Sequence, residues 1–205
     1  ITQFSESVPK KVEEALQELK EKEVEGLILD LRNNSGGLVS SGIAVADSLL
    51  SEKPVVETKN RNGIKDAIIS QKETSFDGPM VTLVNKGTAS ASEILAGSLQ
   101  DNERSILMGE KTYGKGLIQS LKSLGEDSGI AITVASYLTP KGNNIQGQGM
   151  TPDKLLDLPD ASEYGSADDK WVRNAELFLE SLLEKEEFSV QNIELNNAEI
   201  KSLNG

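Results

Sequence analysis

The sequence predicts an α/β fold with a mainly parallel β-sheet, flanking helices and additional β-hairpins. Short, continuously apolar runs at 26–32 and 78–85 have the composition of buried parallel strands. Helical patterns alternate with them, and this alternation implies right-handed βαβ crossovers. Strand-like segments on either side of Asn62-Gly63 and of "GEDSG" (125–129) predict two hairpins.

The other elements follow in order along the chain. Ser7 followed by Pro9 is a helix-start signal, with Ser7 as the cap, and apolar residues then recur at helical spacing up to Leu19. We further expect a small-residue helix at 38–51, a helix at 90–101, a strand at 104–110 and an amphipathic helix at 168–187. The segment 139–153 is the longest loop candidate, and loops of that length are often functional.

The length of 205 residues fits one domain of ordinary size. We assign 1–188 to that domain and 189–205 to a polar C-terminal tail. The opening residues "ITQFSE" have the pattern of a strand interior, so we expect the chain to be a fragment of a longer one.

Composition excludes several function classes. The 33 acidic residues exceed the 21 basic ones and give a net charge of −12, which argues against nucleic-acid binding, and no cluster of Lys and Arg stands out in the sequence. The absence of His and Cys excludes a Ser-His-Asp triad, cysteine nucleophiles, and thiolate or imidazole zinc sites. No apolar run approaches the roughly 18 residues of a membrane span.

The stretch "NKGTASASEILAG" (85–97) contains a candidate nucleophile, Ser90, at the start of a helix. A serine in this position often only caps the helix. As a nucleophile it needs a base, and without histidine the candidates are Asp, Glu, Lys or an N-terminal amine. A lysine base must be neutral, so its pKa must fall well below about 10.4, and burial has this effect.

Lys115 is the best candidate base. It lies between Gly114 and Gly116 and is followed by apolar residues, whereas the other lysines mostly lie in charged surroundings. Glycines allow the backbone to approach another element closely. The alternative is that Lys115 is a surface lysine in a glycine-rich turn.

An oxyanion needs hydrogen-bond donors near Ser90. The N–H of Ala91 lies next to it at the positive end of the helix dipole. A second donor is expected from the turn "NNSGG", where Gly36 and Gly37 can expose backbone N–H groups. The alternative is an ordinary strand-to-helix turn. The turn matches neither phosphate-binding glycine motif.

Four segments together resemble the carboxyl-terminal processing proteases, also called tail-specific proteases. They are "LILDLRNNSGG", "VNKGTASASEILAGSLQD", "GEKTYGKGLIQS" and "YLTPKGNNIQGQGMTPD", and they occur in the family's order within about residues 1–155. The resemblance implies a β-superhelix with flanking helices, as in crotonase-like and Clp-like proteins.

The resemblance also assigns roles to residues. It implies a Ser-Lys dyad of Ser90 and Lys115, with Gln119 holding the lysine in position. It implies an oxyanion hole built by the backbone of Ala91 and of a glycine in "NNSGG", for which we favour Gly36 over Gly37. Ser92 and Glu93 belong to the motif but are interpreted as helix start and packing, and Asp101 as structural support.

The implied activity is a serine endopeptidase that cleaves proteins in or near their C-terminal region, without metal or cofactor. The implied partners are protein or peptide substrates with nonpolar C-termini, and an upstream PDZ-like domain for which this chain has no room. An extracytoplasmic location and pairing with another copy are expected on the same basis. The alternatives are a non-catalytic binding scaffold on the same fold, or a nucleotide-linked Ser-Lys enzyme.

Overall fold

The computed structural model describes residues 1–63, 65–125, 128–157 and 164–184. Its elements are α1 (Val8–Glu21), β1 (Leu27–Asp30), α2 (Val39–Leu49), β2 (Pro54–Asn60), β3 (Lys65–Ile69), β4 (Met80–Val84), α3 (Ala91–Asp101), β5 (Ile106–Gly109), β6 (Leu117–Gly125), β7 (Ser128–Leu138) and β8 (Lys154–Leu155). Residues 170–184 are also helical. The predicted tail 189–205 lies outside the described residues, as does the end of the predicted last helix.

A parallel four-stranded sheet in the order β1-β4-β5-β8 forms the centre of the molecule. Strand β4 is buried at every position, because it has a neighbour on both sides and helices over both faces. Its side chains alternate between those faces: Met80 and Val84 join one apolar core, and Val81 and Leu83 join the other. The predicted fold class is confirmed.

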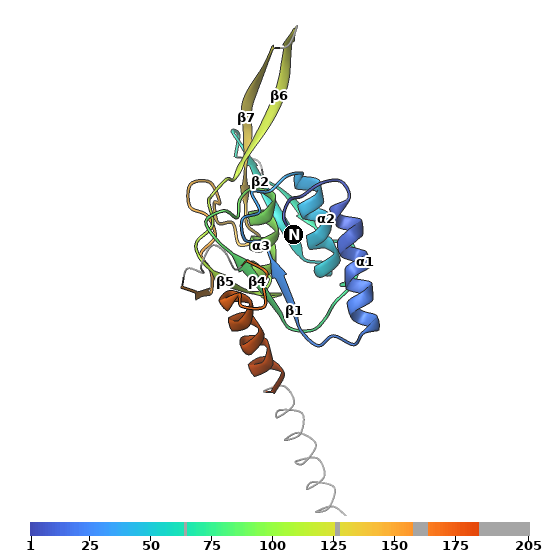
Figure 1. Cartoon of the computed structure of the whole chain (residues 1–205). Helices are drawn as coiled ribbons and strands as arrows, with labels where there is room; N and C mark the ends of the chain where they lie inside the picture. The colour runs from blue at the N-terminus through green and yellow to red at the C-terminus, as the bar shows by residue number, and fades with distance from the viewer. Residues whose placement is uncertain (64, 126–127, 158–163, 185–205) are drawn as a thin grey trace, which may run out of the picture.

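Helices cover the two faces of this sheet differently (Figure 1). Residues of α1, α2 and α3 contribute to the larger core, which contains Met80 and Val84. The helix at 170–184 lies over the opposite face, where Trp171 and Leu179 pack against Val81. This last helix therefore packs directly on the central sheet.

A second four-stranded sheet, in the order β3-β2-β7-β6, is antiparallel throughout. Both predicted hairpins are present in it, and β2 pairs with β7 to join them. The hairpin of β6 and β7 projects away from the body of the molecule (Figure 1). The sequence predicted the hairpins but not that they combine into a sheet of this size.

Two N-terminal details differ from expectation. Ser7 occupies the N-cap position of α1 and proline follows in the first turn, as predicted, but the Ser7 side chain makes no capping hydrogen bond. The strand predicted at "ITQFSE" is reduced to one parallel bridge between Phe4 and Gly37, next to the "NNSGG" turn.

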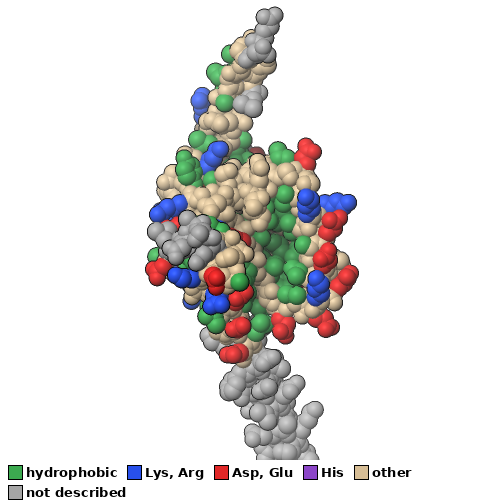
Figure 2. Space-filling model, in the orientation of Figure 1, with side chains coloured by type: hydrophobic (Ala, Val, Ile, Leu, Met, Phe, Trp, Pro, Cys, Tyr) green, Lys and Arg blue, Asp and Glu red, His purple; other side chains and the backbone are tan. Residues whose placement is uncertain are grey.

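An apolar groove of about 390 Å³ lies between α1 and the start of the chain, lined by residues such as Val12, Leu16 and Leu27. Figure 2 shows these apolar side chains bordered by charged ones. Among the helices of the described residues, none is long and apolar enough to cross a membrane.

Candidate active site

Ser90 stands at a sharp turn between β4 and α3, in a backbone conformation that is unusual for serine. Its φ is 59° and its ψ is −120°. A residue other than glycine held in such a conformation costs on the order of 1–3 kcal/mol, and such strain is concentrated at functional sites. The surrounding structure must therefore hold Ser90 in place.

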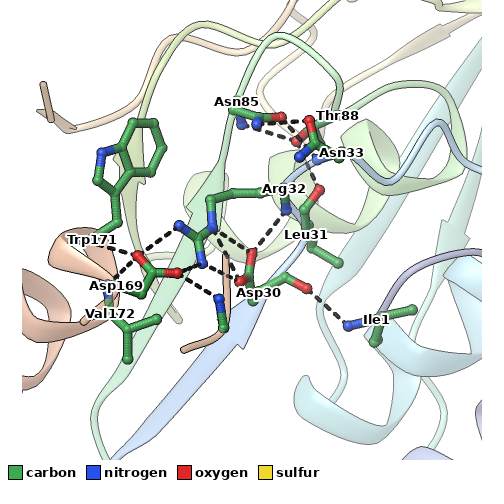
Figure 3. A network of polar contacts seen from close by, with 11 residues as sticks. Ile1, Asp30, Leu31, Arg32, Asn33, Asn85, Thr88, Asp169, Trp171 and Val172 are labelled. Carbon is green, nitrogen blue, oxygen red and sulfur yellow. Dashed lines mark hydrogen bonds and ion pairs between the residues drawn. The ribbon is translucent and has the colours of Figure 1, made fainter. Parts of the chain in front are cut away.

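Hydrogen bonds between two loops provide that support. Strands β1 and β4 are parallel neighbours, so the loops that follow them meet at one edge of the sheet. The Asn33 N–H donates to Asn85 Oδ1 at 2.9 Å, and Asn85 Nδ2 donates to Asn33 Oδ1 at 3.0 Å. Thr88 Oγ1 donates to the Leu31 carbonyl at 2.8 Å (Figure 3). The loop that carries Ser90 is thereby fixed to the "NNSGG" turn.

Gly36 lies directly against Ser90. Its φ is +101°, and an added Cβ would come within 2.8 Å of Ser90 Cβ and 3.1 Å of the Ala91 nitrogen. No room exists for a side chain at this position. Gly36 is thus placed beside the two residues with which it was predicted to act.

The two predicted oxyanion donors differ in their hydrogen bonding. The Ala91 N–H has no acceptor among the described residues, as expected in the first turn of a helix. The Gly36 N–H donates to Asn34 Oδ1 at 2.9 Å, so it already has a partner. The neighbouring Gly37 N–H has no acceptor in the described part of the chain.

Glu93 connects the Ser90 turn to the segment of Lys115. Its side chain is fully buried, and Oε2 accepts hydrogen bonds from the Ser90 N–H at 2.9 Å and from the Lys115 N–H at 2.8 Å. Those two nitrogens lie at most about 6 Å apart because they bind the same oxygen. Oε1 accepts from Thr112 Oγ1 at 2.5 Å and from the Gly114 N–H at 2.6 Å.

The sequence alone indicates only a packing role for Glu93. The signal that could have indicated more is the Ser90-x-x-Glu93 spacing, which is typical of a capping box. That spacing explains the bond from the Glu93 carboxylate to the Ser90 N–H. It cannot reveal the three further donors, which come from residues 112–115.

Lys115 has a tightly packed backbone but an exposed side chain. An added Cβ on Gly116 would come within 2.6 Å of the Gln146 nitrogen, as expected for a close backbone approach. In the described part of the chain, the Lys115 amine makes no hydrogen bond or ion pair. The apolar enclosure expected around this amine is therefore not present in this structure.

Gln119 is exposed on β6, downstream of Lys115. Among the described residues no hydrogen bond joins the Gln119 side chain to Lys115. A bulge in the pairing between β6 and β7 lies between Ile118 and Gln119. The strand alternation from which a shared face was expected is interrupted close to this residue.

A buried ion-pair network lies under the same edge of the sheet (Figure 3). The Arg32 guanidinium donates to both carboxylate oxygens of Asp30 and of Asp169, with the shortest contacts at 2.6 Å. It also lies 5.0 Å from the centre of the Tyr164 ring and 5.6 Å from that of Trp171. Arg32 therefore attaches the last helix to the end of β1.

The pKa values of Arg32 and Asp169 are shifted in the directions that keep both groups charged. Burial by itself raises the pKa of Asp169, but hydrogen bonds from Arg32 and from the Gly165 N–H, together with the charge of Arg32, lower it to about 2. Burial lowers the pKa of Arg32, but the hydrogen bonds and charges of Asp30 and Asp169 raise it overall. Sequence analysis missed both Arg32 and Asp169, which are 137 residues apart.

The sequence model of peptidase family S41 matches residues 1–156. The chain belongs to peptidase family S41. Among the residues that the structure describes, this S41 chain has no group of three or more Asp or Glu side chains placed to hold a metal ion.

Relatives of this S41 chain share its sequence but are longer. It is 51% identical over 159 residues to a carboxyl-terminal-processing protease from Synechocystis sp., covering 78% of this chain and 37% of that protein. It is 46% identical over 156 residues to a chloroplastic C-terminal processing peptidase from Tetradesmus obliquus, covering 75% and 33%. The S41 chain thus spans about a third of the length of these relatives.

A solved structure agrees with both the fold and the family. The photosystem II D1 C-terminal processing protease superposes with a TM-score of 0.74 at 42% sequence identity. The match covers 77% of this S41 chain and 41% of that chain. The resemblance drawn from the four sequence segments is confirmed.

Proposed function

We propose that this chain is the catalytic part of a serine endopeptidase that cleaves proteins in or near their C-terminal region. Ser90 is the nucleophile and Lys115 is the general base. The observation that supports this most is the Glu93 carboxylate, which binds the backbone N–H groups of both residues. The family membership and the strained backbone of Ser90 support it further.

In the proposed reaction, Ser90 Oγ attacks the carbonyl carbon of a peptide bond while neutral Lys115 takes the hydroxyl proton. Collapse of the tetrahedral intermediate breaks the C–N bond, and Lys115 returns the proton to the leaving amine. Water then attacks the acyl carbon with Lys115 again as the base, the ester C–O bond breaks, and Lys115 returns the proton to Ser90 Oγ as the carboxylic acid product leaves. The carbonyl oxygen becomes an oxyanion in each step, held by N–H groups of Ala91 and Gly36.

The bond between Gly36 and Asn34 Oδ1 does not prevent this role. An oxyanion is a stronger hydrogen-bond acceptor than a neutral amide oxygen. The Gly36 N–H can therefore exchange the Asn34 side chain for the oxyanion as the intermediate forms. The Asn34 bond keeps this buried N–H satisfied before substrate arrives.

The exposed Lys115 amine must be enclosed before it can act as a base. An ammonium loses its proton more easily once it is removed from water. We propose that bound substrate covers the amine and that Gln119 then holds it in position. The short distance between the Ser90 and Lys115 backbones is consistent with this arrangement.

The proposed domain extends over residues 1–188. The family match ends at 156, but the helix at 170–184 packs against the central sheet and is attached to it by Arg32. We also propose an upstream PDZ-like domain, substrates with nonpolar C-termini, assembly into homo-oligomers and an extracytoplasmic location. The greater length of the relatives leaves room for such a domain, and some relatives are named chloroplastic.

The second candidate function is a non-catalytic binding scaffold on the same fold. The observation that favours it is the exposed Lys115 side chain, which has no partner among the described residues. A catalytically inactive domain has no need to enclose that amine.

The test is cleavage of an unstructured protein with a nonpolar C-terminal tail by the full-length protein that contains this chain. We expect Ser90→Ala and Lys115→Ala each to reduce turnover by at least about a thousandfold while circular dichroism shows an intact fold. Lys111→Ala, which removes an exposed lysine from the same segment, should retain turnover. Full activity of either dyad variant would refute the assignment, and an inactive wild-type protein would favour the scaffold.

A further inference from the structure

Tyr113 is an exposed aromatic residue two positions before Lys115. Its side chain is 69% exposed, and neither apolar core includes it. In the described part of the chain, this side chain makes no hydrogen bond or ring contact. A single exposed apolar side chain needs no explanation by itself. The backbone that carries Tyr113, however, is held tightly beside the candidate active site.

All four backbone N–H groups of the segment 112–115 have acceptors. The Tyr113 N–H donates to the Thr88 carbonyl at 3.0 Å. The other three donate to the Met150 carbonyl and to the two carboxylate oxygens of Glu93. The backbone of Tyr113 is therefore fixed while its side chain stays free. A tyrosine on a fixed backbone has only two side-chain torsions to order, so it offers a large contact area at a low cost in entropy.

Tyr113 lies close to both members of the proposed dyad. Burial alternates along the segment, so that Tyr113 and Lys115 are exposed and the other two residues are buried. The Cα atoms of Tyr113 and Lys115 are at most about 7.6 Å apart, because consecutive Cα atoms are about 3.8 Å apart. The same limit separates Ser90 from Thr88, whose carbonyl binds the Tyr113 N–H. A peptide that reaches Ser90 therefore passes near the Tyr113 side chain.

The chemistry of the proposed reaction indicates which part of the substrate meets Tyr113. Lys115 must reach the leaving nitrogen in order to return the proton to it. That nitrogen belongs to the residue after the scissile bond, so this residue lies on the Lys115 side of Ser90. The N–H groups of Gly36 and Ala91 instead hold the carbonyl oxygen of the residue before the bond. Tyr113 is therefore nearest to the residue after the bond.

We propose that Tyr113 is a specificity-determining residue that contacts the side chain of the substrate residue directly after the scissile bond. The ring packs against an apolar side chain at that position and finds nothing to pack against when the residue is glycine. The contact also excludes water next to the exposed Lys115 amine, which must lose its proton before the reaction. This inference rests on the proposed peptidase function, and it concerns the cleaved bond itself, wherever the substrate chain ends.

The first experiment uses mass spectrometry to map a bond that the full-length protein cleaves in an unstructured protein. Synthetic peptides around that bond then differ only in the residue after it, which is leucine or glycine, and share the same C-terminal end. We expect kcat/KM to be about fivefold higher for the leucine peptide, as for one apolar contact with an aromatic ring. A ratio of one in the wild-type protein would overturn the proposal.

The variant Tyr113→Ala tests the residue. Its leucine-to-glycine ratio should fall towards one, whereas Tyr113→Phe keeps the ring and should keep the wild-type ratio. Each ratio is measured within one protein, so it does not depend on the fraction of that protein that is folded. A second peptide series varies the residue before the bond, and Tyr113→Ala should leave that preference unchanged. If the variant changes both preferences equally, or neither, the assignment is wrong.

Leu38→Ala is the matched control. Leu38 is another apolar side chain near the site, 44% exposed, and it follows the Gly36-Gly37 turn on the oxyanion side of Ser90. This variant should keep the wild-type ratio for the residue after the bond. An equal fall of the ratio in Leu38→Ala and Tyr113→Ala would show a general effect of apolar surface around the site, and the proposal would fail.

The Ser90→Ala variant separates a failure of this inference from a failure of the proposed function. If Ser90→Ala cleaves the leucine peptide as fast as wild type, the proposed function fails and this inference fails with it. If Ser90→Ala is inactive but Tyr113→Ala keeps the wild-type leucine-to-glycine ratio, the nucleophile stands and only the role of Tyr113 is overturned. An inactive Ser90→Ala together with a lowered ratio in Tyr113→Ala supports both.

Discussion

At the scale of single residues, Glu93 carries more of the candidate site than any other side chain. It is buried and has no cationic partner in the part of the chain that the structure describes, yet four donors from two chain segments satisfy its two oxygens. Hydrogen bonds to a charged group are stronger than those between neutral groups. An acid in this position therefore determines the distance between the Ser90 turn and the segment of Lys115.

Replacing Glu93 with Gln tests this role. The amide keeps the shape, but its NH₂ group must face N–H donors that the carboxylate oxygen accepted, leaving buried donors unsatisfied at about 1–3 kcal/mol. We expect a lower melting temperature and a loss of kcat much larger than any rise in KM. Chemical denaturation and steady-state kinetics of the full-length protein measure the two effects.

Gln100→Glu is the matched control on the same helix. The Gln100 side chain lies at the other end of α3 from Ser90, where its amide donates hydrogen bonds to Asp153 and Thr151. This variant should change stability but leave kcat close to wild type. If Glu93→Gln, like Gln100→Glu, lowers stability but leaves kcat unchanged, Glu93 is only a packing residue, as the sequence suggested.

A methyl group at Gly36 provides a second test at this scale. In Gly36→Ala the new Cβ would meet Ala89 O and Ser90 Cβ at 2.8 Å, in a backbone conformation that alanine adopts poorly. We expect loss of turnover and destabilisation by more than about 2 kcal/mol. Gly63→Ala shares a positive φ but has nothing within 4 Å, so it should cost about 1 kcal/mol and leave activity intact. Equal effects of the two changes in urea denaturation and activity assays would contradict the packing argument.

At the scale of elements, the strands and hairpins could be predicted from local sequence patterns, whereas contacts between distant residues could not. The apolar runs became β1 and β4, and turn residues predicted both hairpins, because these signals lie within a few residues of one another. The attachment of the last helix was not predictable in this way. It depends on Arg32 and Asp169, whose proximity exists only after the sheet and helix have packed.

The pH dependence of stability tests that attachment. The pKa of Asp169 is lowered from an ordinary 3.8 to about 2, so the folded state favours its ionised form. This contribution, about 2 kcal/mol, is complete above pH 4 and is lost as pH falls towards 2. Urea unfolding between pH 2 and pH 5 should show the loss in wild type.

Asp169→Asn should remove much of this pH dependence and cost about 3–5 kcal/mol at pH 7, because Arg32 stays buried with one partner fewer. Asp168→Asn changes the adjacent, exposed carboxylate and should behave like wild type. If the unfolding free energy of Asp169→Asn depended on pH as steeply as that of wild type, other carboxylates would control acid unfolding.

At the scale of the whole molecule, the predicted site residues are brought together only in part. The backbones of Ser90, Ala91, Gly36 and Lys115 gather at one edge of the parallel sheet, as their motifs suggested. Among the described residues, the exposed side chains of Lys115 and Gln119 make no hydrogen bond with Ser90. Motifs in a sequence define which backbone segments converge, whereas side-chain contacts in a catalytic site also depend on the bound substrate.

The bonds between the loops after β1 and β4 also affect how such a protein is made. Asn33 and Asn85 are separated by 52 positions, and Glu93 and Lys115 by 22. A growing chain that has formed only the local turn at Ser90 lacks every one of these bonds, and nothing then offsets the strain of that turn. The geometry of the candidate active site therefore forms late in folding, after segments that are distant in sequence have packed together. Under the proposed peptidase function, a chain that is still folding has no assembled active site and cannot cleave other unfolded proteins.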